Sequence, residues 1–276
     1  MLAMVVCELF AMSSRVRAEV SFSLAELAEH GGRSAPHRDG WGIAYYEDGE
    51  IRLIKESGAA ATSPCIRFIE QRHVSSDAVI AHIRRATEGN VTLRNTQPFA
   101  RELGGAMHVF AHNGDLPGIF RDDHFSFERF HPIGETDSEV AFCCLLERIA
   151  PLFGGEQPAP LEARLDVFAR FAADLAALGP ANLLYCDGTT IFAHSHRRRT
   201  WPTEPLRPPG LHVLVRTCTA EPTLLHAGGV RISGTAEPQR VTLLASVPLS
   251  AEAWRPLPEG TVLALERGEL VAERRS

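Results

Sequence analysis

The sequence predicts an α+β protein in which two mainly antiparallel sheets pack face to face and helices cover their outer sides. Strand patterns fill both ends of the chain around two adjacent long helices. The regular strand–helix alternation of a doubly wound parallel sheet is absent. The 276 residues, 45% of them hydrophobic, are enough to bury one large core. We therefore expect a single domain over residues 7–276.

The first half of the chain contains most of the predicted strands. They cover residues 5–12, 41–47, 51–56, 78–84 and 106–112. The pair Asp48-Gly49 between the second and third strands predicts a hairpin. Two short helices are expected at 24–29 and 64–71. The second has Ser63 as its N-cap and a proline in its first turn.

Two long helices follow, and strands then return. One helix is expected to begin near Thr136, where TDSE is a capping-box pattern, and the other covers 161–178 after the loop FGGEQPAP. The later strands are expected in ANLLYCDG, TIFAHSH, LHVLVRT, RVTLLAS and TVLALER. The arginine-rich segment HSHRRRTWPTEPLRPPG is predicted to be an exposed loop.

Charge and cysteine spacing exclude several classes of protein. The net charge of −6 without a basic stripe argues against a nucleic-acid partner. No segment approaches the ~18 apolar residues of a membrane-spanning helix, so we expect no membrane attachment and a cytoplasmic protein. The six cysteines lack paired CxxC spacing, which argues against a disulfide framework and a zinc ribbon. We expect no metal and no cofactor.

Four polar stretches, together with Cys7, contain the parts needed to hydrolyse a carboxamide. The stretches are HRDGWG at 37–42, HIRRAT at 82–87, AHNGDL at 111–116 and GETDSE at 134–139. Each alone has an ordinary structural explanation, such as a turn, a solvated charge or a helix-start acid. A thiol hydrolase needs a nucleophile and oxyanion donors, and Cys7, the Asn113 amide and the Gly114 N–H supply them. Arg84 suits a carboxylate and Asp137 an ammonium group, so the substrate would be an amino acid.

The same stretches carry a family resemblance. CELFAMS, HRDGWG, HIRRAT, NTQPF, AHNG and GETDSE occur in the order found in class II glutamine amidotransferases. These enzymes are N-terminal nucleophile hydrolases, whose fold is a four-layer αββα sandwich. The resemblance covers residues 7–145 directly, and the later half of the chain is similar to the stand-alone bacterial branch called YafJ-like.

The resemblance implies a role for each candidate residue. Cys7 would attack the side-chain carbonyl of glutamine while its own α-amino group acts as the base. An α-amine has a pKa of about 7.7 to 8, close to working pH. A glutamyl thioester would form, and water would resolve it. The remaining residues would hold the substrate or its oxyanion: Asn113 and Gly114 at the oxyanion, Arg84 and Asp137 at the α-carboxylate and α-ammonium, and Thr87 and Trp41 shaping the pocket.

The first six residues depart from the family pattern. With them in place, the nitrogen of Cys7 is an amide and no base. Residues 1–6 are therefore expected to be a cleaved pro-segment or a misassigned start. In the second case translation would begin at Val6, and removal of that initiator would leave Cys7 as the first residue. If Cys7 is never freed, the chain would be an inactive binding domain.

Two other interpretations stay open at this point. The first is a metal-dependent hydrolase, which the HSH at 194–196 and the twelve histidines of the chain suggest. Alternatively, the enzyme hydrolyses another γ-glutamyl amide, because Arg84 and Asp137 would recognise only the glutamyl end. About 130 residues follow the motif region, too few for a synthase domain of ~150 residues or more. Any acceptor of ammonia is therefore expected to be a separate enzyme.

Overall fold

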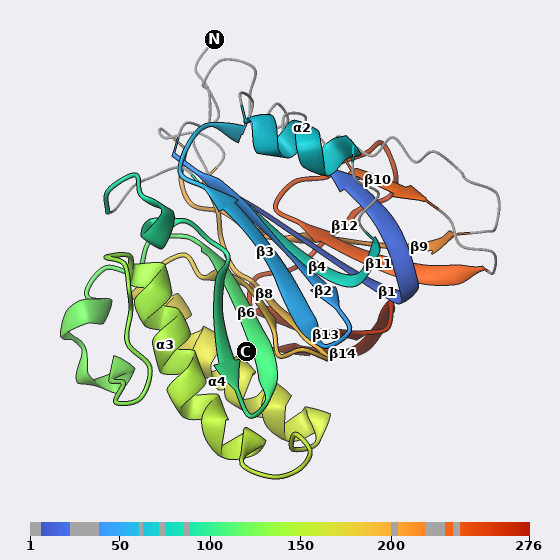
Figure 1. Ribbon diagram of the computed structural model, residues 1–276. Coiled ribbons are helices and arrows are strands. Elements are labelled where there is room, and N and C mark those ends of the chain that lie inside the picture. The colour runs from blue at the N-terminus through green and yellow to red at the C-terminus, as the bar shows by residue number, and fades with distance from the viewer. Residues whose placement is uncertain are drawn as a thin grey trace.

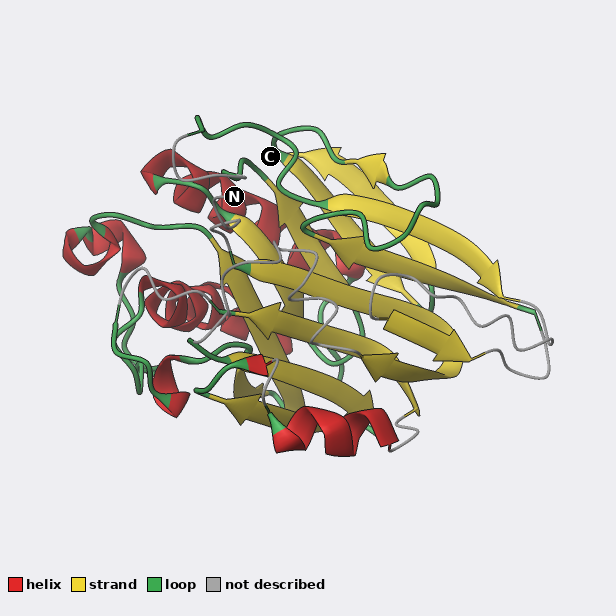
Figure 2. Ribbon diagram, turned by 90° about the horizontal axis from the view of Figure 1, so that it is seen from above, coloured by secondary structure: helices red, strands yellow, loops and turns green. Residues whose placement is uncertain are grey.

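Strands form the centre of the molecule and helices its outside (Figures 1 and 2). The computed structural model describes residues 7–22, 39–60, 63–71, 75–84, 89–199, 204–218, 230–233 and 238–276. The expected helix at 24–29, the segment 1–6 and Thr87 lie outside these residues.

The first sheet has eight described strands and contains the start of the chain. Its order is β12-β9-β11-β1-β4-β2-β3, with β10 also paired to β1, and every pairing is antiparallel. The strands are β1 (Glu8–Phe22), β2 (Trp41–Glu47), β3 (Glu50–Glu56), β4 (Ser75–Ile83), β9 (His212–Cys218), β10 (Val230–Ser233), β11 (Gln239–Ala245) and β12 (Arg255–Pro256).

The second sheet has six described strands in the order β14-β13-β8-β7-β6-β5, again all antiparallel. They are β5 (Phe99–Leu103), β6 (Ala106–Asn113), β7 (Asn182–Cys186), β8 (Ile191–Ser195), β13 (Thr261–Glu266) and β14 (Glu269–Arg275). The chain therefore enters the first sheet, crosses to the second, and returns to each in its last third.

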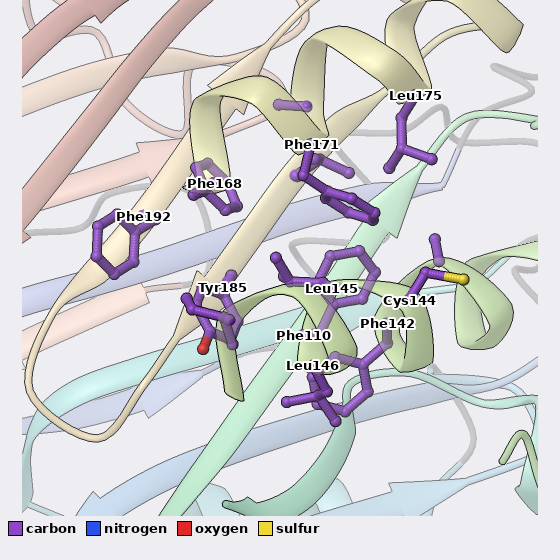
Figure 3. Packing of buried hydrophobic residues seen from close by; sticks show 14 of the residues in the cluster. Phe110, Phe142, Cys144, Leu145, Leu146, Phe168, Phe171, Leu175, Tyr185 and Phe192 are labelled. Carbon is purple, nitrogen blue, oxygen red and sulfur yellow. The ribbon is translucent and has the colours of Figure 1, made fainter. Parts of the chain in front are cut away.

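Three apolar clusters join four layers. Side chains alternate along each strand, so one face of each sheet packs against the other sheet and the opposite face packs against helices. Leu9 and Val109 belong to the cluster between the sheets, and Phe10 to the cluster beneath α2 (Pro64–Gln71). The third cluster lies under α3 (Asp137–Ile149) and α4 (Leu161–Leu178), where Phe110 stacks on Phe142 (Figure 3). In Figure 1, α2 covers one side of the paired sheets and α3 and α4 the other, which confirms the αββα sandwich.

Both predicted helix caps are present. The Ser63 hydroxyl accepts from the Ile66 N–H at 3.1 Å, and the Thr136 hydroxyl accepts from the Glu139 N–H at 3.2 Å. The Glu139 carboxylate does not complete the capping box on Thr136. It accepts instead from the Gly134 N–H at 2.7 Å. Short 3-10 helices are η2 (Leu93–Asn95), η3 (Ile119–Arg121), η4 (Asp123–Phe125) and η5 (Ala150–Phe153). Among the described helices, none has the length and apolarity required to cross a bilayer.

The structure differs from the predicted elements in three places. Strand β1 continues to Phe22 with a register shift between Ser13 and Ala18, whereas the apolar pattern ended at residue 12. Strands β5, β10, β12 and β14 were not predicted, and β14 was missed because three of its four exposed positions carry charged residues. In the arginine-rich segment, Arg197, Arg199 and residues 204–208 are exposed, as expected. However, its first two residues belong to β8, and residues 194–196 and Arg198 are buried.

Candidate active site

Three strand ends from both sheets meet at the candidate site. Cys7 directly precedes β1, Arg84 directly follows β4, and Asn113 is the last residue of β6. The antiparallel register pairs Glu8 with Ile83 and, continued by one residue, places Cys7 opposite Arg84. Residues that are far apart in the chain are therefore brought together by strand pairing.

Asn113 contacts the nucleophile candidate directly. Its side-chain amide donates a hydrogen bond to the backbone carbonyl of Cys7, and Asn113 itself is buried. A carboxamide nitrogen carries two N–H groups, so the contact with Cys7 leaves a second donor. The side-chain amide of Asn113 is therefore held against the residue that carries the thiol. A donor in this place could stabilise an oxyanion formed there.

Gly114 is at a position that only glycine can occupy. A Cβ built there would lie 1.6 Å from the carbonyl oxygen of Pro180 and 2.9 Å from Nε2 of His112. The contact with Pro180 involves backbone, which cannot rotate away. Position 114 therefore requires glycine. The backbone N–H of Gly114 directly follows Asn113 in the chain and has no side chain to shield it.

Arg84 is fixed by backbone carbonyl groups. Its guanidinium donates to the carbonyl oxygens of Asp39 at 3.4 Å, Gly89 at 3.4 Å and Asn90 at 3.2 Å. Burial lowers the pKa of Arg84, and the negative charges of an ionised Cys7 and of Asp39 raise it. Its charge therefore lies within electrostatic reach of the thiol.

Asp137 links the loop after Gly114 to the start of α3. One carboxylate oxygen accepts from the Leu116 N–H at 2.8 Å, and the other accepts from the backbone and hydroxyl of Ser138 at 2.6 and 3.1 Å. The side chain is nearly buried at the first turn of the helix, where a negative charge is favoured. Because Leu116 is two residues after Gly114 in the chain, this hydrogen bond places Asp137 beside the loop that follows Asn113 and Gly114.

Trp41 is fully buried in the cluster beneath α2, and its indole N–H donates to Glu56 at 3.1 Å. Its backbone pairs with Ile83, the residue before Arg84. The predicted contribution of Trp41 to a pocket remains a prediction, as does that of Thr87, which lies outside the described residues.

Two buried amides that the sequence analysis did not single out hold the Asn113 strand in place. Gln97 bonds both backbone groups of His112, accepting at 2.6 Å and donating at 3.1 Å. Asn182 donates to the carbonyl of Asn113 at 3.1 Å and to that of Arg197 at 2.8 Å. The sequence feature that could have identified them is a polar residue beside apolar ones: Gln97 in NTQPF and Asn182 in ANLLYCDG.

The histidines of the HSH segment have local partners. Nδ1 of His194 bonds to the Ala181 carbonyl at 2.6 Å, and Nδ1 of His196 accepts from the Ala181 N–H at 3.3 Å. Nε2 of His196 lies 3.3 Å from Glu259. Within the described ranges, no group of three or more His, Cys, Asp or Glu side chains is arranged to hold a metal ion.

Comparisons with known proteins place the chain in a family. The model of the family described as glutamine amidotransferases class-II matches residues 6–276. The chain is 38% identical over 197 residues to "Putative glutamine amidotransferase YafJ" of Escherichia coli (strain K12), covering 71% of this chain and 76% of that protein.

Solved structures show the same fold. The crystal structure of a predicted glutamine amidotransferase from Pseudomonas aeruginosa matches with a TM-score of 0.70 and 32% identity, over 96% of this chain and all of that one. Glutamine PRPP amidotransferase from B. subtilis matches with a TM-score of 0.58 and 18% identity, over 98% of this chain and 49% of that one, which is a likeness in fold alone. Together with the matched family model, these findings establish that the chain belongs to the class II glutamine amidotransferases.

Proposed function

We propose that this protein is an amidohydrolase that releases ammonia from the side chain of glutamine through a thioester on Cys7. The thiol sulfur attacks the side-chain carbonyl carbon, and the C–N bond breaks as the nitrogen leaves with a proton. Water then attacks the thioester carbonyl, the C–S bond breaks, glutamate is released and the thiol is regenerated. The hydrogen bond from Asn113 to Cys7 is the observation that supports this proposal most directly.

The proton transfers require a base beside the thiol. We assign this role to the α-amino group of Cys7, which a free N-terminus would place two bonds from the side chain. Cys7 must then be the first residue of the working protein. We propose that residues 1–6 are removed or are not translated.

The proposed binding groups match the charges of an amino acid. Arg84 would hold the α-carboxylate and Asp137 the α-ammonium, while Asn113 and Gly114 would stabilise the tetrahedral oxyanion. The buried position of Asp137 and the location of Arg84 opposite Cys7 support these roles. Water-poor surroundings strengthen both charge contacts.

The setting of the reaction is also part of the proposal. Among the described residues, Cys65, Cys143, Cys144 and Cys186 lie outside any disulfide, which supports a reducing, cytoplasmic environment. We propose that any enzyme that consumes the ammonia is a separate chain.

A direct test is to treat the purified protein with a glutamine-analogue electrophile and map the adduct by mass spectrometry. A variant in which Met1–Val6 is replaced by one initiator methionine provides a processed N-terminus at Cys7, and the same variant with Cys7→Ala is its matched control. We expect ammonia release and an adduct on Cys7 only in the first. Ammonia release that persists in Cys7→Ala would contradict the proposal.

The same preparation decides between glutamine and substituted γ-glutamyl amides. Arg84 and Asp137 would hold the glutamyl end in the same way in both. Differences in rate across a panel of amides would therefore show which substituent on the amide nitrogen the site prefers. Faster hydrolysis of a substituted amide than of glutamine would make that amide class the substrate. A processed N-terminus at Cys7 with no turnover of any member would favour an inactive binding domain.

A further inference from the structure

A buried carboxyl group and a buried guanidinium group lie near the Cys7 end of β1, and the proposed catalytic roles do not use them. The side chain of Glu8 is 1% exposed, and that of Arg198, in the loop after β8, is 8% exposed. Burial raises the pKa of Glu8 to about 7, and the charge of Arg198 opposes this rise. Burial lowers the pKa of Arg198, and the charge of Glu8 opposes this fall. Burying either charge without the other would be costly.

Backbone contacts fix the location of Arg198. Its N–H and carbonyl group pair with those of Arg207 at 2.9 and 3.0 Å. Its guanidinium Nη1 donates to the carbonyl of Ser246 at 2.6 Å. Ser246 is itself bound to β1, since its hydroxyl accepts from the Leu9 N–H at 3.0 Å and its own N–H donates to the Leu9 carbonyl at 3.0 Å. The guanidinium is thereby held next to the segment that begins at Cys7.

The pair retains unused hydrogen-bonding capacity. Both carboxylate oxygens of Glu8 and the Nε and Nη2 atoms of Arg198 are buried and have no hydrogen-bond partner among the described residues. Buried polar atoms are nearly always bonded, and exceptions call for a reason. The sequence predicted Arg198 in an exposed loop, where water would satisfy its hydrogen-bonding atoms.

An ionised Cys7 gives the unbonded guanidinium atoms of Arg198 a reason to be buried there. Burial lowers the pKa values of Arg84 and Arg198, and an ionised Cys7 raises both, so the thiolate lies within the field of two guanidinium groups. The two come from different elements, Arg84 from the end of β4 and Arg198 from the loop after β8. The other titratable groups around this cluster are Asp39 before β2, Glu8 on β1, His82 on β4 and His212 on β9.

We propose that Arg198 is a positioning residue that stabilises the ionised thiol of Cys7 and that Glu8 balances the buried charge of Arg198. This inference rests on the proposed role of Cys7 as nucleophile. Glu8 directly follows Cys7 in the chain and offsets the charge of Arg198. Removing the charge of Glu8 should therefore strengthen the effect of Arg198 on the thiol, whereas removing Arg198 should abolish that effect. If Glu8 and Arg198 only stabilised the fold, replacing them would not shift the reactivity of the thiol in opposite directions.

The test is the pH dependence of Cys7 alkylation by iodoacetamide, followed by peptide mass spectrometry. Arg198→Met should move the midpoint of the profile to higher pH by about half a unit or more, and Glu8→Gln should move it to lower pH. Arg198→Lys should retain the wild-type profile, and the double variant should return towards it. Arg197→Met is the matched control, because Arg197 is exposed and pairs with Glu259 at 2.6 Å.

Alkylation requires no glutamine turnover, so this result is independent of whether the proposed function holds. If ammonia release is observed, Arg198→Met should lower kcat and leave KM unchanged. Shifts in the same direction for Arg198→Met and Glu8→Gln, or no shift in either, would overturn the inference. If Arg198→Met does not fold, the isosteric Glu8→Gln decides alone: a downward shift supports the inference, and an unchanged profile rejects it.

Discussion

The side-chain amide of Asn113 donates a hydrogen bond to the carbonyl oxygen of Cys7, 106 residues earlier in the chain. This contact joins the two sheets, because Cys7 precedes β1 of the first and Asn113 ends β6 of the second. The proposed nucleophile and the proposed oxyanion donor are therefore positioned by different sheets. Their relative placement depends on how the sheets pack.

Replacing Cys7 by alanine or serine should abolish ammonia release without unfolding the protein. The side chain of Cys7 is only partly buried, so its loss leaves little cavity. The measurement is ammonia production from glutamine, with circular dichroism to confirm folding. Cys65→Ala is the matched control, since Cys65 is also partly buried but lies in α2. Equal loss of activity in that control would reject the assignment of Cys7.

Asn113→Ala should lower kcat by roughly 10²–10³-fold, the usual consequence of removing one oxyanion donor. The Michaelis constant should change little, because the oxyanion exists only in the transition state. Steady-state kinetics with glutamine measure both. A rise in KM with unchanged kcat would show that Asn113 binds the substrate in its ground state instead.

Gly114→Ala should destabilise the protein by about 1–3 kcal/mol and remove activity, because its Cβ would collide with the Pro180 carbonyl. Gly155→Ala is the control, since a Cβ there would lie 3.6 Å from the nearest atom, the Gln157 carbonyl oxygen. Denaturant unfolding of both variants gives the comparison. Wild-type stability in Gly114→Ala would mean that the Pro180 carbonyl moves aside at no cost.

Arg84→Ala and Asp137→Asn should each lower kcat/KM by roughly ten- to a hundredfold, since a charge-assisted hydrogen bond contributes about 1.5–3 kcal/mol. Asp137→Asn retains a carbonyl oxygen for the Leu116 N–H, which separates the loss of charge from the loss of the loop contact. Kinetics with glutamine and with a glutamine analogue lacking the α-amino group provide the test. If Asp137 binds the α-ammonium, the variant should discriminate between the two less than the wild type does.

Stability should fall below pH 6.5 in part because of His82. Burial between the sheets lowers its pKa from 6.5 to about 3, and neither ring nitrogen has a hydrogen-bond partner among the described residues. As the pH falls, the unfolded chain binds a proton at this residue before the folded protein does, so the folded state is disfavoured. His82→Leu should remove about 2 kcal/mol of the stability difference between pH 7 and pH 5.

Denaturant titrations at pH 7, 6 and 5 measure this effect. His131→Leu is the control, because His131 is exposed and should follow the pH dependence of the wild type. An identical pH dependence in the wild type and in His82→Leu would show that the ring is protonated equally in both states.

Local sequence patterns determined the elements whose residues face a core. Alternating apolar residues specified strands such as β2 and β6, and Ser63 and Thr136 marked helix starts because their hydroxyls satisfy N–H groups within the next three residues. The αββα arrangement was also predicted, through the order of elements and the family resemblance, and is confirmed. Strand β14 was missed because it borders the sheet and three of its four outward residues are charged, so its pattern resembles that of a loop.

The surroundings of each candidate site residue were decided only by the tertiary structure. Nothing in HRRRT distinguishes Arg197 from Arg198, yet the first is exposed and the second is buried beside Glu8. The reason is that the Arg198 backbone pairs with that of Arg207, and its guanidinium donates to the carbonyl of Ser246, which is distant in sequence. Likewise, the Trp41 indole faces α2 because strand alternation and sheet packing, rather than its neighbours in HRDGWG, determine which face it joins. Local patterns specify which atoms are available for chemistry, and long-range packing determines which of those atoms meet.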